Sequence, residues 1–305
     1  MALLALTLTL LAMTAVTEGI TMKRLNMAPD SFDDQYEGCG PAMRAKLPAL
    51  LHTEFQKNPL FAQVWQNAEA KWQSKESPVS PLSSPAQAIA IMAYTMNDLY
   101  KEFNDQVRVA GHSPQEYRDN FHFKTLHFLL TDALVTLRAT QGQQCYWVYR
   151  GVHDIKFKAN VGDIVRFGQF ASSSLRKNVA EVFGTTTVFK VQTCHSAYIQ
   201  AFSYIPREAE VLIPPFEKFK VTEVIEDEEK VEIHLDSIGT NSAYNCEWLT
   251  GGSIPRIPTS SEDDHQGHQD SQTNKATKDT KATTTTMAAL AIMASMWSLW
   301  PPLAL

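Results

Sequence analysis

Three short segments carry residue types that could do chemistry together. Glu208 and Glu210 stand two apart in EAE, and side chains two apart in an extended segment project to the same face. Two like charges at that spacing repel each other, so we expect the pair to be exposed or functional rather than buried. Arg150 ends an otherwise apolar stretch in YRG, and FASSS ends in three hydroxyl residues at 172–174.

Each of these segments alone has an ordinary structural explanation. Arg150 could form a salt bridge at a rim, the serines could form a turn, and the two glutamates could be a charged edge that opposes aggregation. The chain contains no P-loop, GxSxG or HExxH motif. His122 and His127 are five apart in a predicted helix and therefore face different sides, so no metal site is expected.

The elements that must position these segments change character along the chain. Residues from about 30 to 140 are predicted to be helical, because 88–111 and 121–140 repeat apolar residues at three- and four-residue steps. Asp119 or Asn120 is the expected cap of the second helix, and the Pro- and Ser-rich stretch 74–85 is expected to be a loop.

After Cys145 the segments become short and rich in β-branched and aromatic residues. They read CYWVYRG, DIVRFGQFASSS, TTVFKVQT, AYIQAF, EVLIPP, FKVTEVI and KVEIHLDSI, and several alternate in polarity as half-buried strands do. Runs of helix followed by runs of strand predict an α+β fold rather than βαβ repeats.

Composition limits the class of protein further. The 305 residues suffice for one large or two small domains, and a hydrophobic content of 44% excludes a wholly disordered or collagen-like chain. The formal net charge of -6 argues against a general nucleic-acid binder, because such proteins carry a basic excess.

Both ends are apolar and predict processing in the secretory pathway. Residues 1–19 resemble a signal peptide, with a buried first helix as the alternative. The uncharged stretch 287–305 follows a polar low-complexity stalk, 253–286, which is the pattern of a glycosylphosphatidylinositol (GPI) attachment signal. Asn274 or Ser271 is the expected attachment residue, and a short transmembrane anchor is the alternative. The folded domain would then span 20–252 and meet the membrane only through a lipid.

The four cysteines fit an oxidising compartment because their number is even and none are spaced as CxxC. Three pairings are possible. We favour the nested one, Cys39 with Cys246 and Cys145 with Cys194, although the spacing alone does not establish it.

Taken together and in this order, the segments resemble the vertebrate ecto-ADP-ribosyltransferases, NAD-dependent and arginine-specific enzymes with an R–S–E-x-E motif. The resemblance runs through SFDDQYEGC (31–39), KTLHFLLTDAL (124–134), YRGVH (149–153), FASSSL (170–175), EVLIPPFEKF (210–219) and YNCEW (244–248). It implies a helical N-terminal part followed by a mixed or antiparallel β-sandwich core of the ADP-ribosyltransferase type.

The resemblance also implies roles for the residues of the motif. Glu210 matches the carboxylate that stabilises the positive charge formed when the nicotinamide–ribose bond of NAD breaks. Arg150 matches the arginine that contacts NAD through a phosphate and the nicotinamide ribose, and Ser172 matches the catalytic serine that orients the carboxylate. Glu208 matches the residue that pairs with the acceptor guanidinium and helps take its proton. Ser174 is expected to support the turn.

Further positions follow from the same resemblance. Tyr94, Gln169, Ser203 and Gly151 are expected NAD contacts, and Phe183 is expected to stack on the nicotinamide, although Tyr94 and Phe183 could equally be core residues. The chain departs from many family members in the middle of the motif, where it has Ala209 instead of Glu. Both named carboxylates remain.

The implied activity is transfer of ADP-ribose from NAD+ to arginine residues of acceptor proteins, with release of nicotinamide. NAD+ would be a substrate, NADP+ a second one, and no prosthetic group is expected. We expect a monomer on the extracellular face of the plasma membrane, with secretion or a granule lumen as alternatives. A competing enzyme hypothesis is NAD+ glycohydrolysis, against which Glu208 argues. A third is a silent surface antigen, against which the intact motif argues.

Overall fold

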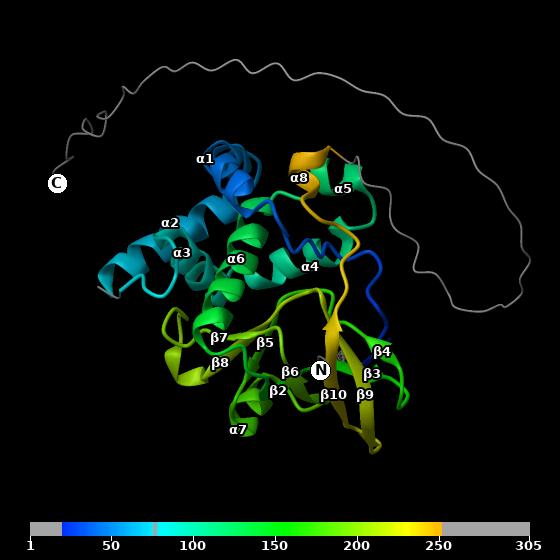
Figure 1. The fold of residues 1–305 in the computed structure, drawn as a ribbon. Coiled ribbons are helices and arrows are strands. Elements are labelled where there is room, and N and C mark those ends of the chain that lie inside the picture. The colour runs from blue at the N-terminus through cyan, green and yellow to red at the C-terminus, as the bar shows by residue number, and fades with distance from the viewer. Residues whose placement is uncertain (1–19, 76–77, 252–305) are drawn as a thin grey trace, which may run out of the picture. The chain divides into compact units, whose positions relative to one another are not determined.

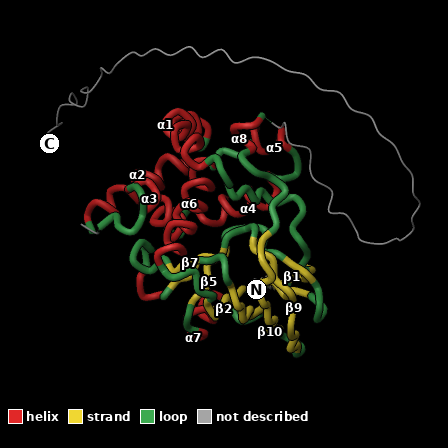
Figure 2. Tube along the Cα trace, in the orientation of Figure 1, coloured by secondary structure: helices red, strands yellow, loops and turns green. Residues whose placement is uncertain are grey.

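The hydrophobic spacing of the first half of the chain produces helices, and the β-rich segments of the second half produce strands (Figure 1, Figure 2). The computed structural model describes residues 20–75 and 78–251. The predicted signal peptide, stalk and attachment signal, with Asn274 and Ser271, lie outside the described residues. Within the described part, no helix is both long and apolar enough to cross a membrane.

Six helices precede the main sheet and form a layer at one end of the described unit (Figure 2). They are α1 (Gly40–Lys57), α2 (Pro59–Ser74), α3 (Pro85–Thr95), α4 (Tyr100–Ala110), α5 (Pro114–Asp119) and α6 (Lys124–Thr140). The predicted single helix over 88–111 is wrong, because Met96 adopts an extended conformation that ends α3, and α4 starts after Leu99. The predicted loop lies between the end of α2 and the start of α3.

Eight of the strands in the described residues form one mixed sheet in the order β4-β9-β10-β6-β2-β5-β8-β7. Their bounds are β2 (Tyr146–Val152), β4 (Ile164–Val165), β5 (Ala171–Ser174), β6 (Thr187–Thr193), β7 (Ala197–Tyr198), β8 (Glu210–Ile213), β9 (Glu217–Glu226) and β10 (Val231–Thr240). Strands β6 and β10 are parallel, and the other neighbours are antiparallel. The α+β fold class with helices first and a mixed sheet second is therefore confirmed.

Several short elements were not expected from the sequence. Strands β1 (Thr21–Arg24) and β3 (Ile155–Lys158) form a separate parallel pair. Short helices α7 (Lys177–Ala180) and α8 (Glu247–Thr250) and the 3-10 helices η1 (Glu181–Phe183) and η2 (Pro206–Glu208) lie among or after the strands. Elements of three or four residues carry too little periodicity to be recognised in a sequence.

Two disulfides join distant parts of the fold, and their pairing is the nested one. Cys39–Cys246 ties the start of α1 to the start of α8. Cys145–Cys194 joins the residues just outside the paired ends of β2 and β6, where Tyr146 stands opposite Thr193.

Two buried carboxylates reinforce the first of these joints. Asp33 forms an ion pair with Arg166 at 2.5 Å and accepts a hydrogen bond from the backbone N–H of Ala243 at 2.8 Å. Asp34 accepts hydrogen bonds from the backbone N–H groups of Cys246 and Glu247, both at 2.9 Å. Buried charges need such partners, so this pair anchors the N-terminal segment to the residues that follow β10.

A third buried carboxylate caps α6. Glu54 on α1 accepts hydrogen bonds from the backbone N–H groups of Lys124 and Thr125, the first two residues of α6. The prediction that Asp119 or Asn120 caps this helix is wrong, because Asn120 instead ends α5. A carboxylate at a helix N-terminus satisfies free donors and faces the positive end of the helix dipole.

Replacing Glu54 with Ala should therefore destabilise the protein. Two hydrogen bonds to a buried charged group are lost and the donors of α6 stay unsatisfied, which should cost about 3 kcal/mol. In a domain of this size that lowers the melting temperature by about 6–12 °C, measured by calorimetry or circular dichroism. The exposed Glu229 gives the control, Glu229→Ala, which should leave the melting temperature unchanged. A stable Glu54→Ala protein would contradict this role for Glu54.

Candidate active site

The sheet places the three motif segments on neighbouring strands. Tyr149 on β2 pairs with Ser174 on β5, and Ser174 pairs in turn with Glu210 on β8. Arg150 follows directly on β2, and its Nη1 donates a hydrogen bond to the backbone carbonyl of Ser172 at 2.6 Å. Segments 20 to 60 residues apart in sequence are thus joined by strand pairing.

Glu210 is a buried carboxylate at the first position of β8. Its side chain accepts a hydrogen bond from the Ser203 hydroxyl at 3.1 Å. Burial raises the pKa of Glu210 to about 7, hydrogen bonds from the Ser172 and Ser203 hydroxyls oppose this rise, and the charge of Glu208 adds to it. Near neutral pH the group is therefore divided between its charged and neutral forms.

Glu208 lies in a different local structure from the one expected. The segment EAE is not extended, because Glu208 ends η2 and Ala209 adopts a left-handed conformation with φ 48° before β8 begins. The two carboxylates therefore do not share one face of a strand. Glu208 is half-buried, burial raises its pKa, and no hydrogen bond or ion pair involves its carboxylate within the described part of the chain. It is free to bind a cation.

The turn that carries Glu208 is held by the end of β5. The Ser174 hydroxyl donates to the carbonyl of Glu208 at 2.6 Å, and the backbone N–H of Leu175 donates to the carbonyl of Ala209 at 3.2 Å. The Arg176 guanidinium donates to the carbonyl of Arg207. Ser174 thus supports the turn, as expected from its place in the motif.

The other expected contact residues fall into different environments. The ring of Tyr94 belongs to the hydrophobic core, and its hydroxyl donates to the carbonyl of Phe170 at 2.9 Å and also reaches Ser172. Phe183 is not a core residue, since it is 55% exposed on η1. Gln169 is half-buried and accepts a hydrogen bond from Arg108, whereas Ser203 is fully buried against Glu210.

Gly151 has a packing role. A Cβ atom at this position would lie 2.3 Å from the carbonyl oxygens of both Ala180 and Gly184, closer than any real contact. The absence of a side chain therefore lets the segment that contains η1 pack directly against β2. Phe183 lies within this segment, on η1.

Two residues of α4 were missed in the sequence. Asn104 donates hydrogen bonds to the Tyr94 hydroxyl at 3.2 Å and to the carbonyl of Phe170 at 3.1 Å, although it is buried between apolar neighbours. Arg108 binds Gln169, and burial together with the charge of Arg150 lowers its pKa. An asparagine at a core-facing helical position was the available signal for the first of them.

Charges of both signs lie in this region. The guanidinium groups of Arg108 and Arg150 interact with each other, as do the carboxylates of Glu208 and Glu210. Such a site can hold a ligand that carries both negative groups and a positive centre. The described residues contain no group of three His, Cys, Asp or Glu side chains that could hold a metal ion.

Comparisons with known proteins identify the family of the chain. A family model described as NAD:arginine ADP-ribosyltransferase matches residues 25–243. The chain is 50% identical over 228 residues to the NAD(P)(+)--arginine ADP-ribosyltransferase 2 of Gallus gallus, covering 74% of this chain and 73% of the relative. It is 44% identical to the GPI-linked NAD(P)(+)--arginine ADP-ribosyltransferase 1 of Homo sapiens, covering 74% of each.

Solved structures of similar proteins have a similar fold. The crystal structure of the eukaryotic mono-ADP-ribosyltransferase ART2.2 is 36% identical, with a TM-score of 0.64, and covers 73% of this chain and 98% of that chain. A variant of that enzyme in complex with NAD matches with a TM-score of 0.62 at 35% identity over the same shares. The chain belongs to the NAD:arginine ADP-ribosyltransferase family.

Proposed function

We propose that this protein transfers ADP-ribose from NAD+, and also from NADP+, to arginine side chains of acceptor proteins, with release of nicotinamide. The observation that carries the proposal is the pair of carboxylates with unlike environments: Glu210 buried and bound by hydroxyl groups, Glu208 half-buried and free. Glu210 is suited to stabilise the reacting sugar, and Glu208 is suited to bind an incoming cation.

The two guanidinium groups support the placement of the dinucleotide. Arg150, with its Nη1 held by Ser172, offers its remaining N–H donors to a phosphate and to the nicotinamide ribose, and Arg108 adds a second positive charge to that end. Phe183, which is exposed and close to β2, stacks on the nicotinamide ring. Tyr94 acts indirectly, because its ring lies in the hydrophobic core and only its hydroxyl reaches Ser172.

Glu210 then acts on the bond that breaks. As the nicotinamide leaves, positive charge grows at the anomeric carbon, and an ionised carboxylate fixed beside it stabilises the transition state more than the ground state. Ser203 and Ser172 hold this carboxylate in place by hydrogen bonds and favour its charged form. Burial strengthens the electrostatic effect because little water competes.

Glu208 acts on the acceptor. A free carboxylate on the turn before β8 pairs with the arginine guanidinium and takes its proton as the new N–C bond forms. Its raised pKa makes it a better base than an ordinary surface glutamate. Water as acceptor needs no such pairing, which is why this residue favours transfer over NAD+ hydrolysis.

The disulfides and the relatives support a place of action outside the cell. Two disulfides in the domain and a predicted signal peptide support an extracellular protein. The predicted attachment signal at 287–305 supports a GPI anchor, and relatives from Homo sapiens and Mus musculus are named GPI-linked enzymes. We therefore propose that the protein acts at the cell surface, with secretion as the alternative.

Substitution of the two glutamates separates their roles. Glu210→Gln should lower both nicotinamide release and transfer to arginine about 10²-fold or more, because the sugar loses its charged partner. Glu208→Gln should lower transfer about 10²-fold while hydrolysis stays measurable, because only the acceptor loses its base. Both products are measured in one reaction by chromatography. Glu229→Gln is the control, and equal loss of both activities in Glu208→Gln would contradict the assigned roles.

The pH profile should follow the carboxyl group of Glu210. Because the ionised form acts in catalysis and its pKa is about 7, kcat/KM for nicotinamide release should fall as the pH drops below about 7. Ser203→Ala removes a hydrogen bond to the charged form, so the fall should begin at a higher pH. The exposed Ser74→Ala serves as a control. An acid limb near the pKa of an ordinary glutamate would refute this account.

The anchor can be tested on intact cells that express the full chain. Treatment with a phosphatidylinositol-specific phospholipase C should release most of the protein from the surface into the medium, because the lipid is its only membrane contact. Release is measured by immunoblot of medium and cells. Protein that stays with the cells after treatment would favour the transmembrane alternative, and protein in untreated medium would favour secretion.

A further inference from the structure

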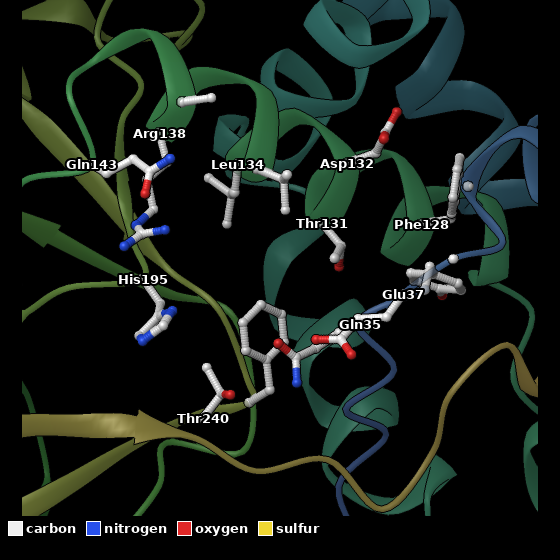
Figure 3. A pocket seen from close by; sticks show the side chains of 16 residues that line it. Gln35, Glu37, Phe128, Thr131, Asp132, Leu134, Arg138, Gln143, His195 and Thr240 are labelled. Carbon is white, nitrogen blue, oxygen red and sulfur yellow. The ribbon is translucent and has the colours of Figure 1, made fainter.

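A cavity lies away from the motif residues. It has a volume of about 510 Å³ and is bordered by α6, by the segment before α1, and by residues at the ends of β6, β9 and β10 (Figure 3). None of Arg150, Ser172, Glu208 and Glu210 lines it. Its volume is in the range of cavities that bind small organic molecules.

One face of α6 forms a wall of this cavity. Thr131, Leu134 and Arg138 follow one another at steps of three and four residues and therefore lie on the same side of the helix. Figure 3 shows their side chains in this order along the helix. The wall is thus polar at both ends and apolar in the middle.

The polar group at one end has no partner. Thr131 is 1% exposed, and its hydroxyl makes no hydrogen bond with any described residue. Thr95 and Thr136 each donate to the carbonyl four residues earlier, whereas Thr131, like Thr125 on the same helix, makes no such bond. A buried hydroxyl without a partner is costly, and Figure 3 shows this side chain directed into the cavity.

The group at the other end is positively charged. The Nε of Arg138 donates to the carbonyl of Cys194 at 2.6 Å, and its two terminal nitrogens have no partner among the residues that the structure describes. His195 lies on the same side in Figure 3, and burial and the charge of Arg138 lower its pKa. Two of the described acidic residues line the cavity: Asp132 is already bound by Arg44 at 2.6 Å and Gln87 at 2.7 Å, and Glu37 is exposed to solvent.

We propose that this cavity binds a small organic carboxylate with an apolar body and a polar far end. The carboxylate pairs with the free edge of Arg138, the body lies on Leu134, and the far end accepts or donates a hydrogen bond at Thr131. Seven helical residues separate the two polar groups, so the ligand must span about 10 Å. The ligand class follows from these three contacts and does not depend on the proposed transferase activity.

A fused aromatic hydroxy acid has the required length and chemistry. We would titrate 6-hydroxynaphthalene-2-carboxylate into protein purified after expression of the full chain, and follow binding by saturation-transfer NMR. The expected dissociation constant is about 1 mM or lower. The corresponding carboxamide, which lacks the charge, should bind about tenfold more weakly. No binding of the acid, or equal binding of acid and amide, would overturn the proposal.

Variants locate the ligand. Arg138→Gln should weaken binding of the acid about tenfold, whereas Arg24→Gln, at an exposed arginine elsewhere, should not change it.

Thr131→Val tests the other end of the ligand. It should leave the melting temperature unchanged or higher, and it should weaken binding of the hydroxy acid but not binding of naphthalene-2-carboxylate. Thr53→Val is its control, because that hydroxyl is bound to the carbonyl of Ala49. If Arg138→Gln does not fold, the Thr131→Val variant provides the test. Unchanged binding of the hydroxy acid by that variant would overturn the proposal.

Discussion

The burial of one carboxylate is the constraint on which this site depends. Glu210 lies almost wholly inside the protein, where a charge is costly unless neighbouring groups stabilise it. The Ser203 and Ser172 hydroxyls provide part of that stabilisation, and the remaining cost raises the pKa of the group to about 7. A positively charged sugar centre would supply the rest. In the proposed mechanism, the positive charge of the reaction forms beside this carboxylate.

Strand pairing gives this carboxylate its neighbours. The register of β2, β5 and β8 sets Arg150, Ser172 and Glu210 at fixed positions, and Gly151 lets the segment with Phe183 pack closely against β2. The helical layer contributes from the other side, with α3 and α4 carrying Tyr94, Asn104 and Arg108. The buried carboxylate of Glu54 joins α1 to α6 within that layer, and those of Asp33 and Asp34 tie the segment before α1 to the residues that follow β10. Polar groups inside the fold therefore serve both its stability and its chemistry.

The sequence predicted the order of helices and strands and the residues of the motif, because long periodic segments and clusters of unusual residue types can be recognised from the sequence alone. It did not predict that Glu54 caps α6, since a cap taken from another helix leaves no local pattern. It placed Glu208 and Glu210 on one extended face, but Ala209 adopts a left-handed conformation that only the turn around it enforces. The core position of Tyr94, the exposure of Phe183 and the cavity beside α6 likewise depend on packing between distant segments.

The central claim is that the two carboxylates together direct ADP-ribose to a guanidinium group. The most direct measurement incubates the purified protein with NAD+ and agmatine, a small guanidino acceptor, and determines nicotinamide and ADP-ribosyl-agmatine in the same tube. The account predicts nearly equal amounts of the two products. Nicotinamide without the adduct would show that water is the acceptor and that Glu208 does not perform the proposed role, and the absence of both products would contradict catalysis altogether.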